Sequence, residues 1–454
     1  MLDYMLVPGS VGTTTAQIWI GSTIEGPADP AQVRLEHPPS GISWNLGPWQ
    51  RWSAPAGAPF VRYQTFSLTG LKASTRYPLT LRVGSDVRAR ADVTTLPQTL
   101  PPVGQPPFIL MLVSCFSRLQ DASGLAGRTY ARLPAGALPT VKLFVGDQVY
   151  LDSPWYSYVD PKTSTELADR FFAHYAETWG QSGDAQGFNV ILSSGANYFC
   201  SDDHEFWNNA PFPATYAVNT WTAGGRQVWW THARALFEAF QTTGTRRTLN
   251  IGQLSVLMID TRLNRQIDRS ALMSASDFAA FEAWVAALTS PGILAVGQPV
   301  FDTRSGFTGN FADWNFPDFA QYADICRVLL SSRQPIIVLT GDVHYGRIAS
   351  ATLPSGAELV EIISSPLALV EPAAGGKWLP APDRFPAEPI PGLATIPVTT
   401  DNTWERFANH FITIELNDSA GGLQVVVRTW ETGSQPAAIR SATVAERVLK
   451  RNPS

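Results

Sequence analysis

Apolar and polar residues alternate along the N-terminal part of the chain. Residues 13–20, 33–36, 63–68 and 77–83 follow this pattern, and Gly and Pro lie between them. Alternation with a period of two is typical of strands that bury one face, while Gly and Pro favour the turns that join such strands. Residues 1–98 are therefore predicted to form an all-β sandwich domain.

One segment of this region carries a more specific pattern. Residues 68–77, Leu-Thr-Gly-Leu-Lys-Ala-Ser-Thr-Arg-Tyr, precede a strand with Leu79, Leu81 and Val83 on one face. The run resembles the E–F corner of fibronectin type III domains, where a Tyr hydroxyl hydrogen-bonds back to the chain. The resemblance implies a fibronectin-III-like sandwich anchored by Tyr77, and some other small sandwich is the alternative.

The pattern changes after a proline-rich segment. Residues 97–107 contain five prolines, which favour a stiff linker, and we place its limits at residues 99–107. Beyond it, continuous apolar runs alternate with segments whose apolar residues recur at helical spacing. This alternation predicts an α/β (α+β) domain over residues 108–454, in which helices cover the faces of a sheet.

The elements expected in this second domain follow from the same periodicities. Strands are predicted at residues 108–113, 141–145, 254–259 and 336–339, helices at 168–178, 231–240 and 277–288, and antiparallel strands at 411–416 and 423–430. The stretch 371–405, rich in Pro and Gly, is predicted to be a long loop, and 442–450 a terminal helix.

Composition narrows the classes of protein to which the chain can belong. Of its 454 residues, 44% are hydrophobic and 16% charged, which indicates a well-buried globular protein. The net charge of −5, without a run of basic residues, argues against a nucleic-acid partner. The three cysteines, Cys115, Cys200 and Cys326, cannot form a disulfide framework.

The N-terminus shows no signal-peptide pattern, and the apolar runs are too short to span a membrane. We therefore expect a cytoplasmic protein without a membrane span. The sequence does not indicate the oligomeric state.

Motifs of acidic residues, histidine or cysteine follow the apolar runs. They occupy residues 113–115, 146–150, 202–205 and 341–344. In α/β sheets, ligands bind outside the carboxyl ends of the strands, where all of these motifs are expected to lie. They supply enough carboxylate, imidazole, thiolate and phenolate groups for more than one metal ion. A metal-dependent hydrolase is therefore the leading hypothesis.

Asp147 is the best candidate to bridge two metal ions, because it follows a buried strand and a glycine. Tyr150 can turn back to the same site, and a phenolate favours a trivalent ion such as ferric iron. Cys115 can be a thiolate ligand or a small buried hydrophobe. Asp342 and His344 are two residues apart, so their side chains point the same way if the segment is extended.

The motif Asp202-Asp203-His204-Glu205 places an imidazole among carboxylates. Carboxylate neighbours hold a histidine in one tautomer and raise its pKa, which suits a general acid. Asp203 is the candidate metal ligand of this motif. Arg262, which follows the strand at residues 254–259, can clamp a phosphate or tie loops together by pairing with an Asp.

Taken together, these motifs resemble the PhoD-like alkaline phosphatases of the calcineurin-like metallophosphoesterase superfamily. The resemblance runs from about Phe108 to Pro366. Within this range, it rests on the motifs above and also on the segments 208–209, 260–262, 297–299, 313–314 and 364–366. It implies a metallophosphoesterase sandwich of mixed β-sheets flanked by helices, preceded by an N-terminal β domain. Cys115 departs from the wider superfamily, where Asp-x-His begins the pattern.

The resemblance also implies a metal centre of Fe³⁺ and Ca²⁺, with other divalent ions as alternatives. The ligands implied are Cys115, Tyr150 and His344 for iron, Asp203 and Asp342 for calcium, and Asp147 for both. The oxygen-rich second set fits a hard cation.

Catalytic roles are implied in the same way. A hydroxide held by the ferric ion attacks phosphorus, and His204, oriented by Glu205, protonates the leaving group. Arg262 is assigned a further catalytic role, and Asn208 and Asn209 are assigned to substrate binding. The family is usually exported, so the missing export signal is a departure from it.

The predicted activity is hydrolysis of phosphomonoesters, on a small molecule or a phosphate-containing polymer. Phosphodiester cleavage by the same metal centre, for example of nucleotides, teichoic acids or phospholipids, is the first alternative. A non-catalytic binding or adhesion protein with a decayed metal site is an alternative of another class. An oxidoreductase is disfavoured, because redox iron sites usually keep an open, His-rich or facial-triad set of ligands.

Overall fold

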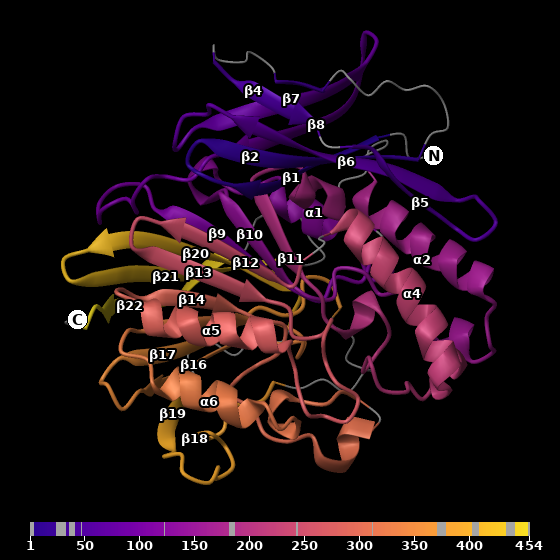
Figure 1. Ribbon diagram of the computed structural model, residues 1–454. Coiled ribbons are helices and arrows are strands. Elements are labelled where there is room, and N and C mark those ends of the chain that lie inside the picture. The colour runs from indigo at the N-terminus through magenta and orange to yellow at the C-terminus, as the bar shows by residue number, and fades with distance from the viewer. Residues whose placement is uncertain are drawn as a thin grey trace.

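The computed structural model describes residues 4–23, 33–35, 41–46, 48–121, 123–180, 187–241, 244–310, 312–369, 378–401, 408–432 and 441–452. Over these residues the chain forms small β-sheets at its N-terminus and larger sheets covered by helices in the remainder (Figure 1). The predicted order, an all-β region followed by a mixed α/β region, is confirmed.

The N-terminal sheets lie at the top of Figure 1. One has the strand order β1-β2-β6-β4, with β5 also paired to β6, and the other has the order β3-β7-β8. Ile18, Phe66 and Leu68 are fully buried in one core with residues of β7, as a period-two pattern requires. The strands are β1 (Tyr4–Val11), β2 (Thr15–Ser22), β3 (Val33–Leu35), β4 (Ser43–Leu46), β5 (Gln50–Ser53), β6 (Phe60–Thr69), β7 (Arg76–Val83) and β8 (Asp86–Thr94).

The first large sheet has the order β11-β10-β9-β20-β21-β22. Strands β9, β10 and β11 are parallel, and the others pair antiparallel. The carboxyl ends of the parallel strands therefore lie at the same edge. The bounds are β9 (Phe108–Val113), β10 (Val141–Val145), β11 (Ala196–Cys200), β20 (His410–Ser419), β21 (Gly422–Glu431) and β22 (Ser441–Lys450).

The second large sheet has the order β12-β13-β14-β15-β17-β16-β19-β18. Strands β13, β14, β15 and β17 run parallel, so this sheet also gathers carboxyl ends at one edge. The bounds are β12 (Arg246–Ile251), β13 (Leu254–Ile259), β14 (Gly292–Ala295), β15 (Ile336–Thr340), β16 (Arg347–Thr352), β17 (Glu358–Ile363), β18 (Arg384–Phe385) and β19 (Ile396–Thr400).

The two large sheets share one core, and helices cover their outer faces. In β9, Leu110 and Leu112 join the core that also holds residues of the second sheet, whereas Met111 and Val113 pack with α2 and α4. Helices α5 and α6 pack on the second sheet through a third cluster. The helices are α1 (Leu125–Tyr130), α2 (Ser164–Trp179), α3 (Phe188–Leu192), α4 (Ala223–Phe240), α5 (Ala275–Ala287) and α6 (Tyr322–Leu330).

Two predicted elements near the C-terminus are wrong. Residues 442–450, predicted as a helix, belong to β22, because their backbone pairs with β21 from Ser441 to Lys450 and this pairing overrides helix propensity. The stretch 371–405 is not only loop, since β19 pairs with β16 and β18. Residues 371–377 and 402–405 lie outside the described residues.

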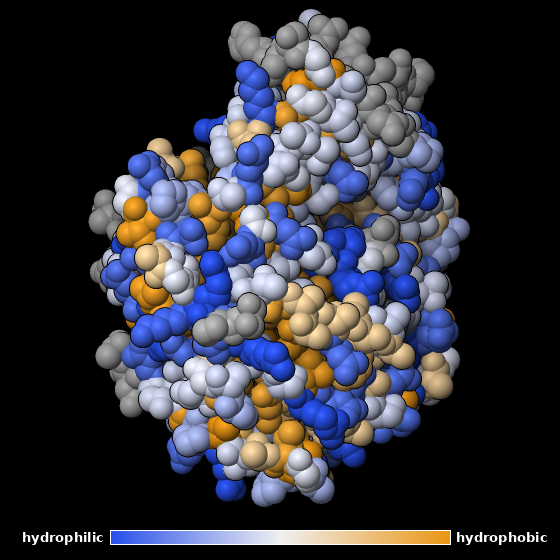
Figure 2. All heavy atoms as spheres, turned by 60° about the vertical axis from the view of Figure 1, so that its left-hand side comes forward, coloured by the Kyte–Doolittle hydropathy of each residue, from blue (hydrophilic) through white to orange (hydrophobic). Residues whose placement is uncertain are grey.

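Among the described residues, no helix is long and apolar enough to cross a membrane. Figure 2 shows hydrophilic and apolar side chains interspersed over the face that carries α5 and the hairpin of β20 and β21.

The predicted hydrogen bond between the Tyr77 hydroxyl and the preceding chain is present. The Lys72 backbone N–H donates to the Tyr77 hydroxyl at 2.7 Å, and Tyr77 is buried. We expect Tyr77→Phe to lower the free energy of unfolding by about 1 kcal/mol, because the Lys72 N–H loses its acceptor. Chemical denaturation followed by fluorescence measures this change. Tyr156→Phe, at an exposed position, is the control; equal stability of the two variants would contradict the anchoring role.

Candidate metal centre

The predicted motifs meet where the carboxyl ends of the two large sheets face each other. Cys115 follows β9, Asp147 follows β10, Asp203 follows β11, and the segment of Asp342 and His344 follows β15. Because parallel strands end at one edge of each sheet, motifs far apart in the sequence become neighbours. The predicted strand-end placement is therefore present in the fold.

The backbone at these positions is unusual. The angle φ is 55° at Cys115, 61° at Asp147, 68° at Asp342 and 57° at His344. Residues other than glycine rarely adopt this left-handed region, and holding them there costs energy that the surrounding structure must supply. Such outliers concentrate at functional sites, and here they coincide with candidate ligands.

One group of side chains surrounds an oxygen of Asp147. The distance from Asp147 Oδ2 to Cys115 Sγ is 3.4 Å, and the distance to Tyr150 Oη is 3.3 Å. Tyr150 Oη also lies 3.5 Å from His344 Nε2. Ligand atoms of Cys115, Asp147 and His344 all lie within 4.8 Å of one another. A thiol, a carboxylate, a phenol and an imidazole thus face one small volume.

A second group shares Asp147. Ligand atoms of Asp147, Asp203 and His204 lie within 4.8 Å of one another. Asp203 Oδ2 accepts the backbone N–H of Asn209 at 2.6 Å, while Asp203 Oδ1 and Asn209 Oδ1 are buried without a hydrogen-bond partner among the described residues. Buried oxygens without a donor are expensive, so they fit a cation at this position.

The electrostatics of the cluster also fit cations. Burial, followed by the charge of Asp203, raises the pKa of Asp147 well above its usual value. Burial likewise raises the pKa of Asp342, with Asp202 adding to the shift, and the pKa values of Cys115 and Tyr150. Burial and the neighbouring acids disfavour these anionic forms, and a bound cation would reverse that preference.

His204 is held by an aspartate that sequence reasoning missed. His204 Nδ1 lies 2.8 Å from Asp152 Oδ1, and Asp152 Oδ2 accepts from Asn208 N at 2.7 Å and from the Tyr216 hydroxyl at 2.5 Å. Burial alone would lower the pKa of His204, but the carboxylates of Asp152 and Asp203 raise it well above its usual value. The only sequence signal was the position of Asp152, two residues after Tyr150.

The role predicted for Glu205 needs a correction. Its carboxylate does not serve as the partner of the His204 ring; it accepts backbone N–H groups of Asp147 at 2.8 Å, Gln148 at 2.6 Å and Asp202 at 2.9 Å. In a tight turn, adjacent side chains diverge, and Glu205 faces the end of β10 instead. It ties the segments after β10 and β11 together.

Arg262 lies in an internal ion-pair network. It is fully buried, with Nε 2.6 Å from Asp202 Oδ1 and Nη2 2.6 Å from Asp313 Oδ2. Gln298 extends the network, because its Nε2 lies 2.5 Å from Asp313 Oδ2 and 3.1 Å from Asp342 Oδ2. These contacts match the alternative in which Arg262 ties loops together by pairing with an Asp. The other alternative, in which Arg262 binds a phosphate, stays a prediction.

The two asparagines predicted to bind substrate differ in burial and in their contacts. Asn208 is partly exposed, and its Nδ2 donates to Ala312 O at 3.0 Å. Asn209 is buried, and its Nδ2 donates to Gly309 O at 2.9 Å. Asn208 is therefore partly accessible to solvent, whereas Asn209 is buried and donates its backbone N–H to Asp203.

These features define the class of structure. The chain has the metallophosphoesterase fold, with mixed sheets packed face to face between helices.

No protein-family model matches the sequence, and no curated protein matches it. Among solved structures, PhoD matches with a TM-score of 0.63 and 14% sequence identity over 99% of this chain and 90% of that chain. The purple acid phosphatase PPD1 from yellow lupin (Lupinus luteus) seeds matches with a TM-score of 0.55 and 11% identity over 99% of this chain and 75% of that chain.

Asp147→Asn should raise the thermal midpoint of the metal-free protein and weaken its response to metal ions. The raised pKa of Asp147 means that its charged form destabilises the metal-free fold, and Asn removes that charge. The same change removes the candidate ligand that both groups share. We expect a rise of about 2 °C without metal and a smaller rise than wild type when Fe³⁺ and Ca²⁺ are added.

Calorimetry on chelator-treated protein measures both effects. Asp169→Asn, at an exposed position of α2, is the matched control. An Asp147→Asn protein that metals stabilise as strongly as the wild type would remove Asp147 from the centre.

Proposed function

We propose that the protein is a metal-dependent phosphoesterase, and specifically a phosphomonoesterase of the PhoD-like kind. The observation that carries this proposal is the convergence of unlike ligand groups around Asp147, beside buried oxygens that have no donor among the described residues. The fold shared with PhoD and a purple acid phosphatase supports it.

Each ligand group suits one kind of ion. Cys115, Tyr150 and His344 would hold an iron ion, since thiolate, phenolate and imidazole suit a transition metal. Asp203 and Asp342 would hold a hard ion such as calcium. Such ions, when bound, activate water and stabilise negative charge on phosphoryl oxygens.

His204 supplies the proton that the leaving group needs. Because Nδ1 is engaged by Asp152, Nε2 is the ring nitrogen that can donate to the leaving oxygen. Asp152 keeps the imidazolium favourable, and it is fixed by Tyr216 and by the backbone of Asn208. The His204 ring also stacks on Tyr150, with 4.0 Å between the ring centroids, which restricts its orientation.

A substrate panel combined with elemental analysis tests the proposal. We expect purified protein to contain iron and a divalent ion, and to hydrolyse p-nitrophenyl phosphate faster than bis-p-nitrophenyl phosphate. Faster cleavage of the diester would favour a phosphodiesterase with the same centre. A preparation that takes up neither metal and cleaves neither ester would instead favour a binding protein with a decayed site.

His204→Ala should cost alkyl phosphates more than aryl phosphates. Loss of a general acid typically costs 10² to 10⁴ in rate, and we expect a loss of about that size for an alkyl ester. Nitrophenolate leaves readily without a proton, so its ester should lose far less. Equal losses for both substrates would remove His204 from the acid role.

Asp152→Asn should move the alkaline limb of the kcat profile to lower pH. The carboxylate of Asp152 raises the pKa of His204, so its loss lets the imidazolium deprotonate at lower pH. Asp160→Asn, at an exposed position in the same loop, is the control. An unchanged profile in Asp152→Asn would show that Asp152 does not act through His204.

A further inference from the structure

The segment at residues 364–367 follows β17 and contacts the ends of two other strands. The Ser364 N–H donates to Thr340 O at 3.1 Å, where β15 ends, and the Leu367 N–H donates to Ser114 O at 2.9 Å, directly after β9. Both serines of the segment are buried. The segment is therefore held between the strands that lead to two candidate ligands of the first group.

The Ser365 hydroxyl contacts both of these candidate ligands. Its Oγ donates to Cys115 Sγ at 3.1 Å and accepts the backbone N–H of His344 at 2.9 Å. A hydroxyl has one proton and two lone pairs. Because the N–H of His344 uses a lone pair, the proton of Ser365 is left for the sulfur. One side chain thus ties the sulfur that follows β9 to the backbone that follows β15.

Ser114 is the other hydroxyl near this sulfur. Its Oγ lies 3.4 Å from Cys115 Sγ and 3.0 Å from Ser364 O, and its single proton cannot serve both. Two further oxygens near the sulfur belong to a carboxylate and a carbonyl group, which accept hydrogen bonds. Ser365 has the shorter contact and, among the described residues, no second acceptor for its proton. It is therefore the main hydrogen-bond donor to the sulfur.

A hydrogen bond to a metal-bound sulfur changes what the sulfur gives to the metal. A donor beside a ligating cysteine draws electron density from the thiolate, and such bonds are among the means by which proteins tune metal sites. Weaker donation from sulfur leaves the ion a stronger Lewis acid, and Lewis acidity is the property that activates water. A hydroxyl in this place acts on the centre without touching either the substrate or the ion.

We propose that Ser365 is a positioning residue of the first ligand group, whose hydroxyl holds the Cys115 sulfur beside the His344 segment and reduces the electron donation of the thiolate to a bound ion. This assignment rests on the proposed function, because it takes Cys115 and His344 as ligands of one ion. Ser365 then offsets the strong donation of a thiolate at a centre that needs Lewis acidity.

Cobalt(II), added to chelator-treated full-length protein, is the probe. Charge transfer from a thiolate to Co²⁺ gives an absorption band whose energy reports on the electrons of the sulfur. In Ser365→Ala those electrons are less stabilised, so we expect the band at longer wavelength and an affinity for Co²⁺ about tenfold lower, as is typical when a partner of a metal ligand is lost. Cys115→Ser should lose the band, which assigns it to this sulfur and not to Cys200 or Cys326.

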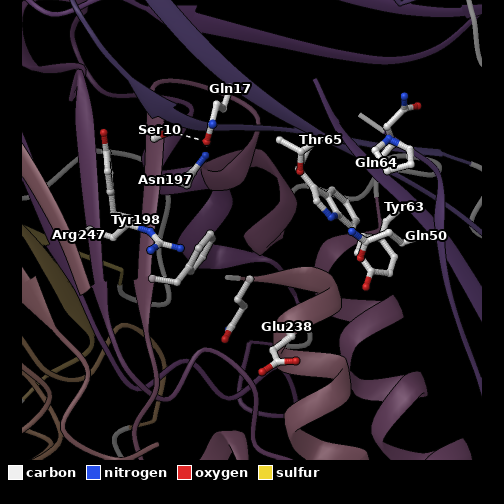
Figure 3. A pocket seen from close by; sticks show the side chains of 15 residues that line it. Ser10, Gln17, Gln50, Tyr63, Gln64, Thr65, Asn197, Tyr198, Glu238 and Arg247 are labelled. Atoms are coloured by element: carbon white, nitrogen blue, oxygen red, sulfur yellow. Dashed lines mark hydrogen bonds between the residues drawn. The ribbon is translucent and has the colours of Figure 1, made fainter. Parts of the chain in front are cut away.

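Matched variants separate the hydrogen bond from the mere loss of a hydroxyl. Ser364→Ala removes a buried hydroxyl of the same segment that has no hydrogen-bond partner among the described residues. Ser10→Ala removes a hydroxyl that donates to Gln17 Oε1 at 2.7 Å, in a cleft that the N-terminal sheets share with β11 (Figure 3). Both should keep the wild-type band and affinity. Ser365→Thr keeps the hydroxyl and should keep the band.

An unchanged band in Ser365→Ala would overturn the proposal, as would an equal shift in Ser364→Ala. Wild-type protein that hydrolyses phosphoesters but binds Co²⁺ without a sulfur band would overturn it and leave the proposed function standing. Protein that takes up no metal and cleaves no ester would overturn both. Circular dichroism of each variant distinguishes a folding defect from a change at the centre.

Discussion

The structure depends most on the burial of several carboxylates at one meeting point of strand ends. Burial raises the pKa of Asp147 well above its usual value and that of Asp202 to about 6. A buried charge must be paired, because leaving it alone costs several kcal/mol. On one side the chain supplies the partner itself, since Arg262 pairs with Asp202. On the other side, Asp203 keeps a buried oxygen without a donor among the described residues. The acid cluster is thus divided into a half neutralised by arginine and a half that suits cations.

Glycine makes the close approach of these strand ends possible. A Cβ at Gly146 would lie 2.4 Å from the Cβ of Asp202, and a Cβ at Gly341 would lie 2.3 Å from the Cβ of Ser114. Both contacts are shorter than any tolerated carbon–carbon distance, so a larger residue would push β10 away from β11, or β15 away from β9. In Gly146-Asp147 and in Gly341-Asp342, the glycine is therefore required for packing and the aspartate is a candidate metal ligand. The glycine lets the strands meet, and the aspartate that follows adopts a positive φ and turns toward the centre.

Local pattern was enough to predict the strands β9, β10, β13 and β15 and the polar residues that follow them. Buried parallel strands read as continuous apolar runs, and polar residues directly after such runs are conspicuous. Contacts between distant segments were not predictable in this way. Asp152 looks like a loop residue until the fold brings it to His204, and Glu205, the nearest carboxylate in sequence, faces the backbone of another strand end. The strand β22 was missed because its sequence favours helix and only its pairing with β21 decides otherwise.

Gln241, at the C-terminal end of α4, is joined to the candidate metal centre by a short chain of contacts. Gln241 donates to Gln148, whose backbone N–H is held by Glu205 and whose neighbour is Asp147. The link contains a single side-chain hydrogen bond of 3.2 Å, and such a bond contributes about 0.5–1.5 kcal/mol. The segment that carries Asp147 is therefore held mainly by Glu205, which accepts the backbone N–H groups of Asp147, Gln148 and Asp202.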